Sequence, residues 1–481
     1  MSAATYRKAV AVVGILVVVA AVGSLVLMTY LTRNVPEVHA DIQQHFKYGS
    51  IGSDTDNGVP YWIWRVLPRL FPEYLPDRPG EGYARIGFIY EAPGNDRPIG
   101  TSVREHPIPL VGLNCAVCHT GVLQDAPDGP AKIVLGMPAI QFDLEMYFRF
   151  LFACAADPRF NADTLIPAIK QENPSFGLLD ELMYRFIVIP RARDGLNRRA
   201  AEIAQLANQP PFGPGRVDTF GAYKIHFGLP IGDADLVGIA DLPSLWNQRP
   251  RQGLWLHWDG NNDRVQERNI SAALGAGATE DSLDEPSLNR IADWTMDFQP
   301  PLRFPEDRID RARVEAGKAI YQARCAACHD IGAERIGQVT PLAQIGTDAE
   351  RLNSFTPELA EKMNTFGTGR PWRFSHFRKS DGYANMPLDG LWLRAPYLHN
   401  GSVPTLRDLL EPPERRPTLF YRGYTVYDYA NVGFVTSGPE AERAGFRYDT
   451  TVRGNGNRGH VYGTDLTPEE KAVLLEYLKT L

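Results

Sequence analysis

Two copies of one short motif constrain the fold of this chain more than any other feature. The first is CAVCH, Cys115–His119, and the second is CAACH, Cys325–His329. C-x-x-C-H is the attachment pattern of a c-type haem, in which two thiols reach the two vinyl groups of one porphyrin and the adjacent histidine ligates the iron. Chance predicts roughly 0.001 such motifs in a chain with this cysteine and histidine content. The chain is therefore predicted to fold around two covalent haems, held by Cys115, Cys118 and His119, and by Cys325, Cys328 and His329.

The remaining cysteine chemistry is simple. No other C-x-x-C pair exists, so the sequence lacks the extra ligand pairs of a zinc site. The fifth cysteine, Cys154, stands in the apolar stretch LFACAADPRF and is predicted to be a buried small hydrophobe rather than a reactive thiol.

The net charge of −7 and the absence of a long Lys/Arg run exclude a nucleic-acid partner.

The N-terminal segment Ala9–Leu31 has 23 residues without a charge. As a helix it would span about 35 Å, enough to cross a bilayer. Arg7 and Lys8 precede it, which predicts a cytoplasmic N-terminus and a single-pass anchor in the cytoplasmic membrane. The rest of the chain is then expected in a bacterial periplasm. A cleaved signal peptide is the alternative.

The second motif has the surroundings of a small cytochrome. The preceding residues, from Glu306, predict a helix with Val314, Gly317, Ile320 and Tyr321 on one face. At the C-terminus, Thr467 as N-cap, Pro468 and Glu470 form a capping box before a leucine stripe. We expect a mainly α fold with long loops: a membrane anchor over 1–33, a first haem domain over 34–300 and a cytochrome c-like domain over 301–481. The linker-like stretch Asp297–Arg308 marks the boundary.

What occupies the second axial face of each iron separates electron transfer from oxygen or peroxide chemistry. For the second haem, His460 is favoured because the glycines around it let its backbone approach the porphyrin. His399 in LRAPYLHNGSV and Met386 in ANMPLDG are the alternatives, and Arg394 in the former segment is a candidate cofactor contact. The residues after the first motif contain no comparably marked ligand, which is consistent with an open iron there.

The order CAVCH, LHWDGNN, CAACH and APYLHNGSVPTL resembles the bacterial dihaem cytochrome c peroxidase superfamily. The longer segments FKYGSIGSDTDNGVPYWIWRVLP, HWDGNNDRVQERNISAALGAGA and GNGNRGHVYGT are closer to its branch of rubber oxygenases and dihaem fatty-acid dioxygenases. The resemblance implies that Trp258 lies between the haems, that His119 serves the substrate haem, and that His329 with His460 ligates an electron-storing haem. A calcium ion between the domains is also implied.

The sequence departs from the peroxidase pattern at the distal wall of the first haem. Peroxidases carry a carboxylate after the W-D-G turn that helps to cleave the O–O bond. Here the corresponding run begins with Ala272 and Ala273, and Glu267 or His257 could act only if the fold turned them inward. An apolar wall would make room for an alkyl chain, whereas a packed helix–helix contact is the alternative interpretation of this run.

Three functions follow as hypotheses. The first is an oxygenase that uses O2 on a long, apolar, lipid-like unsaturated substrate. The second is a peroxidase that reduces H2O2 with electrons from a small cytochrome or copper protein, and the third is a dihaem electron carrier. The aromatic stretch at residues 59–76 is predicted to be core, with a substrate entrance at the lipid surface as the alternative.

Overall fold

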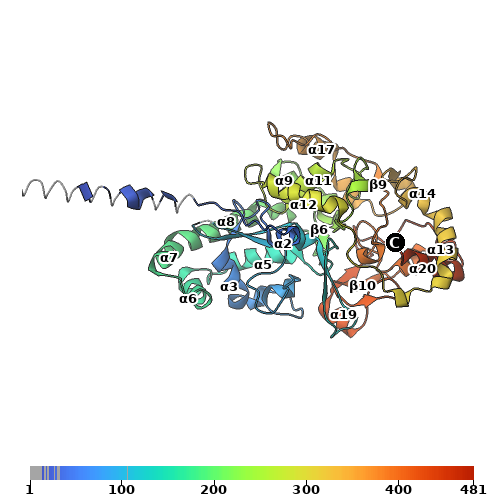
Figure 1. Cartoon of the computed structure of the whole chain (residues 1–481), viewed down its shortest axis with the longest axis horizontal. Helices are drawn as coiled ribbons and strands as arrows, with labels where there is room; N and C mark the ends of the chain where they lie inside the picture. Colours follow the sequence, from blue (N-terminus) through green and yellow to red (C-terminus); the bar gives the residue numbers. More distant parts are fainter. Residues whose placement is uncertain (1–13, 16–17, 19–20, 26–27, 30–32, 106) are drawn as a thin grey trace, which may run out of the picture.

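The computed structural model describes residues 14–15, 18, 21–25, 28–29, 33–105 and 107–481. Short helices alternate with long loops, and the later elements lie at the opposite end of the molecule from the N-terminal segment (Figure 1). Helices and small antiparallel sheets occur together, so the fold is mixed rather than mainly α. The sheets escaped prediction because their strands are only two to four residues long, too short for an alternating pattern to stand out.

The helices of the first part are α2 Ile42–Tyr48, α3 Tyr61–Leu70, α4 Cys115–Cys118, α5 Leu144–Ala156, α6 Ala162–Glu172, α7 Leu178–Met183, α8 Ile189–Glu202, α9 Gly221–His226, α10 Asp233–Val237, α11 Val265–Gly275 and α12 Glu285–Asp297. A π-helical segment, Tyr184–Val188, joins α7 to α8. The helices of the second part are α13 Arg311–Arg324, α14 Ala326–His329, α15 Leu342–Ile345, α16 Glu350–Ser354, α17 Pro357–Met363, α18 Leu406–Leu409, α19 Pro439–Ala444 and α20 Pro468–Leu478.

The strands are β1 Val59–Pro60, β2 Thr101–Arg104, β3 Leu110–Leu113, β4 Thr120–Leu123, β5 Lys132–Leu135, β6 Arg216–Val217, β7 Ala240–Asp241, β8 Val339–Pro341, β9 Gly382–Ala384, β10 Leu419–Arg422, β11 Tyr427–Asp428, β12 Gly433–Phe434 and β13 Phe446–Asp449. One sheet has the order β1-β3-β2, and the others are the pairs β4-β5, β6-β7, β8-β9, β10-β13 and β11-β12. Each pair is antiparallel.

The predicted cytochrome-like helix pair is confirmed. Helix α13 buries Val314, Gly317 and Tyr321, and α20 begins with the predicted capping box at Thr467. The two helices contact each other closely because Gly317 has no side chain: a Cβ there would lie 2.2 Å from the carbonyl oxygen of Val473. Any larger residue at this position would push α20 away from α13.

Three clusters of buried apolar residues form the core. The first contains Tyr61, Trp64 and Phe71, together with Cys154. The aromatic stretch 59–76 is therefore core, and its alternative interpretation as a lipid-facing entrance is wrong. The other two clusters draw residues from both sides of residue 300. The predicted domain boundary stays a prediction, but the two parts share their packing.

The predicted anchor, Ala9–Leu31, falls mostly on residues outside the described ranges. Within the part of the chain that the structure describes, no helix is long and apolar enough to cross a membrane. The described pieces of this segment include the helical residues 21–25.

Candidate haem centres

The second motif stands at the end of α13, where helix α14 carries His329. The Nδ1 atom of His329 donates to the carbonyl oxygen of Met386 over 2.7 Å. This bond fixes the orientation of the imidazole and leaves the other ring nitrogen free to ligate a metal, as is usual for metal-binding histidines.

His460 faces His329. The ring centroids lie 6.3 Å apart. Two imidazoles that ligate one metal from opposite sides, each nitrogen about 2 Å from it, would have centroids roughly 6 Å apart. Among the described residues, the buried Nδ1 of His460 finds no hydrogen-bond partner. The pair thus fits an iron with two axial histidines.

The loop that carries His460 is held in an uncommon conformation. The backbone of His460 has a φ of 47°, and its N–H donates to Ile345 over 2.8 Å. The buried guanidinium of Arg416 donates to the carbonyl oxygens of Asn457 and Gly459 at 2.6 and 2.9 Å. Because sequence-distant groups hold this strained loop, the ring of His460 is oriented before any metal binds.

The other two candidates for this position lie elsewhere. The ring of His399 stacks on Tyr383 at 4.1 Å, and its Nε2 lies 3.1 Å from the Tyr383 hydroxyl. Met386 contacts the Nδ1 atom of His329 through its backbone carbonyl oxygen. The arrangement therefore favours His460 over His399 and Met386.

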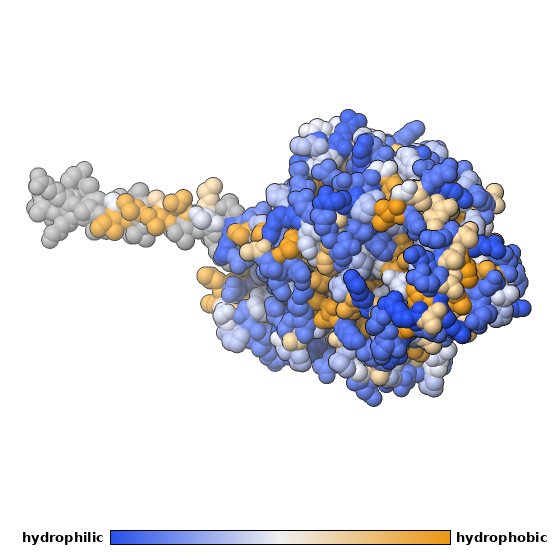
Figure 2. All heavy atoms as spheres, turned by 45° about the vertical axis from the view of Figure 1, so that its right-hand side comes forward, coloured by the Kyte–Doolittle hydropathy of each residue, from blue (hydrophilic) through white to orange (hydrophobic). Residues whose placement is uncertain are grey.

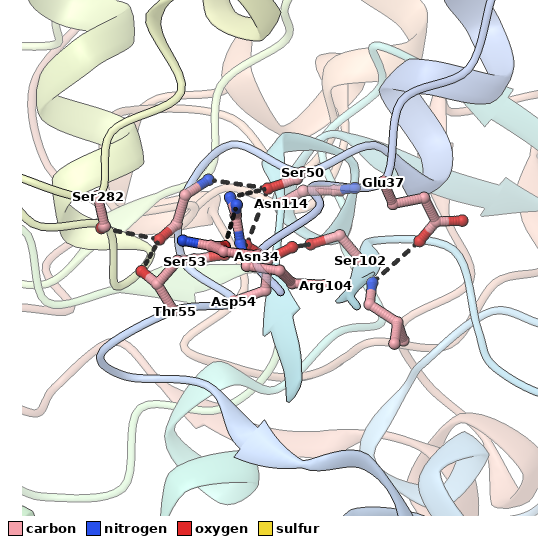
Figure 3. A network of polar contacts seen from close by, with 12 residues as sticks. Asn34, Glu37, Ser50, Ser53, Asp54, Thr55, Ser102, Arg104, Asn114 and Ser282 are labelled. Carbon is pink, nitrogen blue, oxygen red and sulfur yellow. Dashed lines mark hydrogen bonds and ion pairs between the residues drawn. The ribbon is translucent and has the colours of Figure 1, made fainter. Parts of the chain in front are cut away.

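The first motif forms α4, which begins directly after strand β3. Asn114 caps this helix: its side-chain oxygen accepts from the N–H of Ala116 at 3.0 Å, and its amide donates to the carbonyl oxygen of Gly49 at 3.0 Å. Asn114 belongs to a buried polar network beneath the motif (Figure 3). At its centre the Asp54 carboxylate accepts from Arg104 at 3.0 Å, and both side chains are almost fully buried. The network fixes the start of the motif to the body of the protein.

His119 is oriented in the same way as His329. Its Nδ1 donates to the carbonyl oxygen of Pro243 over 2.8 Å. Burial, with a smaller contribution from the nearby charge of Arg268, lowers the pKa of His119 to about 4. The imidazole is therefore neutral at pH 7, as metal ligation requires.

Arg268 stands on α11, which carries the alanine run. Its pKa is lowered to about 10 by burial, although the side chain is only half-buried by accessible area. Ala272 lies one turn further along the same face and is accessible. Ala273 points the other way and is fully buried. The predicted pocket wall is thus wrong for Ala273, which packs in the core.

The other groups proposed for acid–base chemistry are engaged elsewhere. The Glu267 carboxylate lies 2.7 Å from Nδ1 of His376 and accepts the N–H of Ser375 at 3.1 Å. The Nδ1 atom of His257 lies 2.6 Å from the side-chain oxygen of Asn261, and burial lowers its pKa to about 4. The cationic side chain on the accessible face of α11 is Arg268, which the sequence interpretation missed because no motif marks it.

Three guanidinium groups form a series, because Arg251 interacts electrostatically with both Arg268 and Arg394. Arg268 donates to Gln248 at 2.6 Å, and Arg251 donates to Asp389 at 2.5 Å. The positive charge of Arg394 lowers the pKa of His329. The Arg394 guanidinium lies 3.2 Å from the same Asp389 carboxylate. Burial lowers the pKa of Arg394 to about 10, and its buried Nε is without a partner among the described residues. Two guanidinium groups, Arg251 and Arg394, share the Asp389 carboxylate, and guanidinium groups of this kind fit the propionates of bound porphyrins.

Trp258 connects the segments that orient the two histidines. Its indole N–H donates to the carbonyl oxygen of Asp241 over 2.9 Å, two residues before Pro243. Its own carbonyl oxygen accepts from the N–H of Ala384 over 2.8 Å, two residues before Met386. The resulting chain of covalent and hydrogen bonds runs from His119 through Pro243, Asp241, Trp258, Ala384 and Met386 to His329.

The W-D-G turn itself is fixed by burial and charge. Asp259 is fully buried and pairs with Arg351 of α16 at 3.1 Å. Gly260 has a φ of 64°, and a Cβ there would lie 2.5 Å from Val339. Only glycine therefore lets this turn dock against β8.

A cavity of about 530 Å³ opens beside the first turn of α11. Its apolar lining includes Val265, Met296 and Trp372; Arg264 and Arg373 add two cations, and Asp263 and Glu267 add two carboxylates. Its volume is in the range of small-molecule sites. For the calcium ion implied by the resemblance, the described residues contain no cluster of three or more His, Cys, Asp or Glu side chains that could hold a metal.

Parts of the chain match known protein families. Residues 382–421 match a family described as RoxA-like, cytochrome c-like. Residues 312–371, which include the second motif, match cytochrome C oxidase, cbb3-type, subunit III. Both matches are cytochrome c-type, and such domains hold covalently bound haem c. The chain is accordingly a haem c redox protein.

Two relatives come from Sinorhizobium fredii. Uncharacterized protein y4iJ is 26% identical over 83% of this chain and 81% of its own length. Uncharacterized protein y4iM is 35% identical over 41% of this chain and 50% of its own length. The chain thus resembles the first over most of its length, whereas the second matches over about half of its own.

Proposed function

We propose that the chain is a membrane-anchored, periplasmic dihaem oxidoreductase that oxygenates a long, apolar, unsaturated substrate with O2. Bound haem c supplies an iron that exchanges electrons and, where one axial face is open, reacts with a small oxidant. His119 and His329 would each hold one iron, and His460 would close the second face of the latter. The proposal extends the haem c redox role to a specific chemistry.

The difference between the two centres carries this proposal. His329 has a second imidazole opposite it at 6.3 Å between centroids, whereas the group of α11 that acts on His119 is Arg268, with Ala272 one turn further along the same helix. A closed centre suits electron storage, and a centre with room suits substrate chemistry. A simple electron carrier needs no such asymmetry.

The residues on α11 favour an oxygenase over a peroxidase. Glu267 is tied to His376, so no free carboxylate is aimed from α11 toward His119 to move the protons that peroxide cleavage needs. The cavity beside α11 is lined by apolar side chains, by the carboxylates Asp263 and Glu267, and by Arg264 and Arg373; its apolar part suits an alkyl chain, and Arg373 suits a terminal carboxylate. A long-chain unsaturated fatty acid has both features.

Trp258 is proposed to connect the centres electronically. Its two hydrogen bonds join the segment next to His119 to the segment next to His329. Removing the indole N–H leaves the backbone bond and breaks the side-chain bond. Trp258→Phe should therefore slow turnover while haem content stays constant, and Trp255→Phe, three residues earlier, is the matched control.

The experiment that tests the function is oxygen uptake by the purified holoprotein with an unsaturated fatty acid, without peroxide or reductant. Uptake with an oxygenated product identified by mass supports the oxygenase. Oxidation of a reduced small cytochrome only after H2O2 is added would replace it with the peroxidase. Failure of both reactions, together with no binding of CO to either haem, would leave the electron carrier.

A further inference from the structure

Helix α7 and the π-helical segment after it form an exposed apolar surface, named here the α7 patch. Its members are Leu178, Leu179, Leu182, Phe186 and Ile187, which are 71, 81, 45, 69 and 45% exposed. Leu178, Leu182 and Phe186 are spaced four residues apart, which places them on one face. Leu179 and Ile187 each stand next to a member of this series. Soluble proteins rarely expose so many large apolar side chains together.

The opposite face of the same segment is well packed. Tyr184, Val188 and Ile189 are buried in the first core cluster. Ion pairs of 2.7 Å join Glu181 to Lys170 and Arg185 to Asp163. The segment is therefore firmly attached to the body of the protein, and the apolar side chains on its outer face are held outward.

Positive charge follows the patch along the chain. From Leu178 to Arg199 there are five arginines against three carboxylates. Arg191, Arg198 and Arg199 of α8 are exposed. Exposed apolar side chains beside arginines are the composition of segments that lie in the interface of an anionic bilayer.

The position of the patch points to the same partner. The chain leaves the N-terminal segment at Val35, whose backbone exchanges two hydrogen bonds with Glu105 at 3.0 and 2.9 Å. This bridge fixes the point from which the N-terminal segment departs. That segment and α7 lie at the same end of the molecule (Figure 1), and Figure 2 shows apolar surface at this end beside the N-terminal segment.

We propose that the α7 patch is a second contact with a phospholipid bilayer, besides the N-terminal segment. Its apolar side chains would enter the acyl-chain boundary while the arginines of α8 meet anionic headgroups. Two contacts at one end would hold the body in one orientation on the membrane. The inference rests on the proposed membrane attachment and is independent of the proposed oxygenation chemistry.

The test uses the full-length holoprotein in vesicles of phosphatidylethanolamine and phosphatidylglycerol. Leu179→Cys is labelled with the fluorophore NBD, and Ile331→Cys, which is 55% exposed beyond α14 at the opposite end of the molecule, is the matched control. Cys154 is fully buried and escapes labelling. We expect a blue shift and quenching by doxyl lipids at position 179 and neither at position 331. Adding Leu182→Glu should reduce the quenching at 179 several-fold with haem content unchanged.

Each other outcome overturns the inference in a different way. A protein that floats with the vesicles but shows equal signals at both positions would leave only the N-terminal attachment. A protein that does not float with the vesicles would contradict both membrane contacts. The proposed oxygenation would not be affected by that result, because oxygen uptake is measured in detergent. A blue shift that rises with protein concentration without vesicles would assign the patch to a second copy of the chain.

Discussion

The buried ion pair beneath the first haem motif predicts a large loss of stability for Asp54→Ala. Asp54 accepts hydrogen bonds from Ser50 and Ser102 at 2.8 Å and from Arg104 at 3.0 Å. Removing one partner of a buried ion pair costs about 3–5 kcal/mol, because the other charge remains buried. Arg104 keeps bonds to Ser50 and Asn34 at 3.0 Å, so we expect a loss near the lower end, about 3 kcal/mol.

Urea denaturation of the holoprotein, followed by tryptophan fluorescence, measures this loss. Asp54→Asn keeps one acceptor oxygen, which can still accept from Ser50 and Arg104 although not from Ser102, and should cost less than Asp54→Ala. Asp297→Ala, which breaks the exposed pair with Arg249 at 2.5 Å, is the control and should change little. Because Asn114 joins the network to α4, haem content should also fall at the first motif before the second. If Asp54→Ala costs no more than Asp297→Ala, the reasoning from burial is refuted.

Four further outcomes are expected. His460→Ala should let the second haem bind CO, seen as a doubled CO difference spectrum; an unchanged spectrum would assign the second axial face to another residue. Ala272→Phe should reduce turnover of a long-chain substrate at constant haem content, because its side chain projects from the accessible face of α11, and equal loss of haem would mean that it disrupts the fold instead. Arg268→Gln removes one positive charge near His119, so redox titration should show that the first haem is harder to reduce, by about 59 mV for each tenfold change in the one-electron equilibrium. An unchanged potential would place Arg268 away from the first haem. Burial lowers the pKa of His45 to about 4, whereas the unfolded imidazole titrates near 6.5, so the unfolded chain binds more protons between these two pH values. The free energy of unfolding should therefore fall as the pH decreases through this range. In urea denaturation, His45→Asn should flatten that slope.

The local features of the second half could be predicted from the sequence. The capping box at Thr467, the buried face of α13 and the linker after α12 depend on residues within a few positions of one another. Helix start signals and apolar periodicity report such short-range structure directly. His460 was favoured for a similar local reason, the glycines on either side of it.

The groups that orient the haem histidines could not be predicted, since they come from distant parts of the chain. Pro243 and Met386 contribute only backbone carbonyl oxygens, which any residue could supply. Arg268 and Arg251 carry no motif; Arg251 pairs with Asp389, more than one hundred residues later, and Arg268 donates to Gln248. A sequence pattern identifies the ligands of a centre more readily than the side chains and carbonyls that surround it.

The two bonds of Trp258 explain why a tryptophan stands in the turn between the motifs. Its backbone is docked on β9 through Ala384, which is part of the second half of the chain. Its indole reaches Asp241, which belongs to the first half. A phenylalanine could fill the space but could not donate to that carbonyl, and a shorter donor on the same backbone would not reach it. Only a large side chain with an N–H at its far end satisfies both segments, so this residue couples the positions of His119 and His329 as well as the path between them.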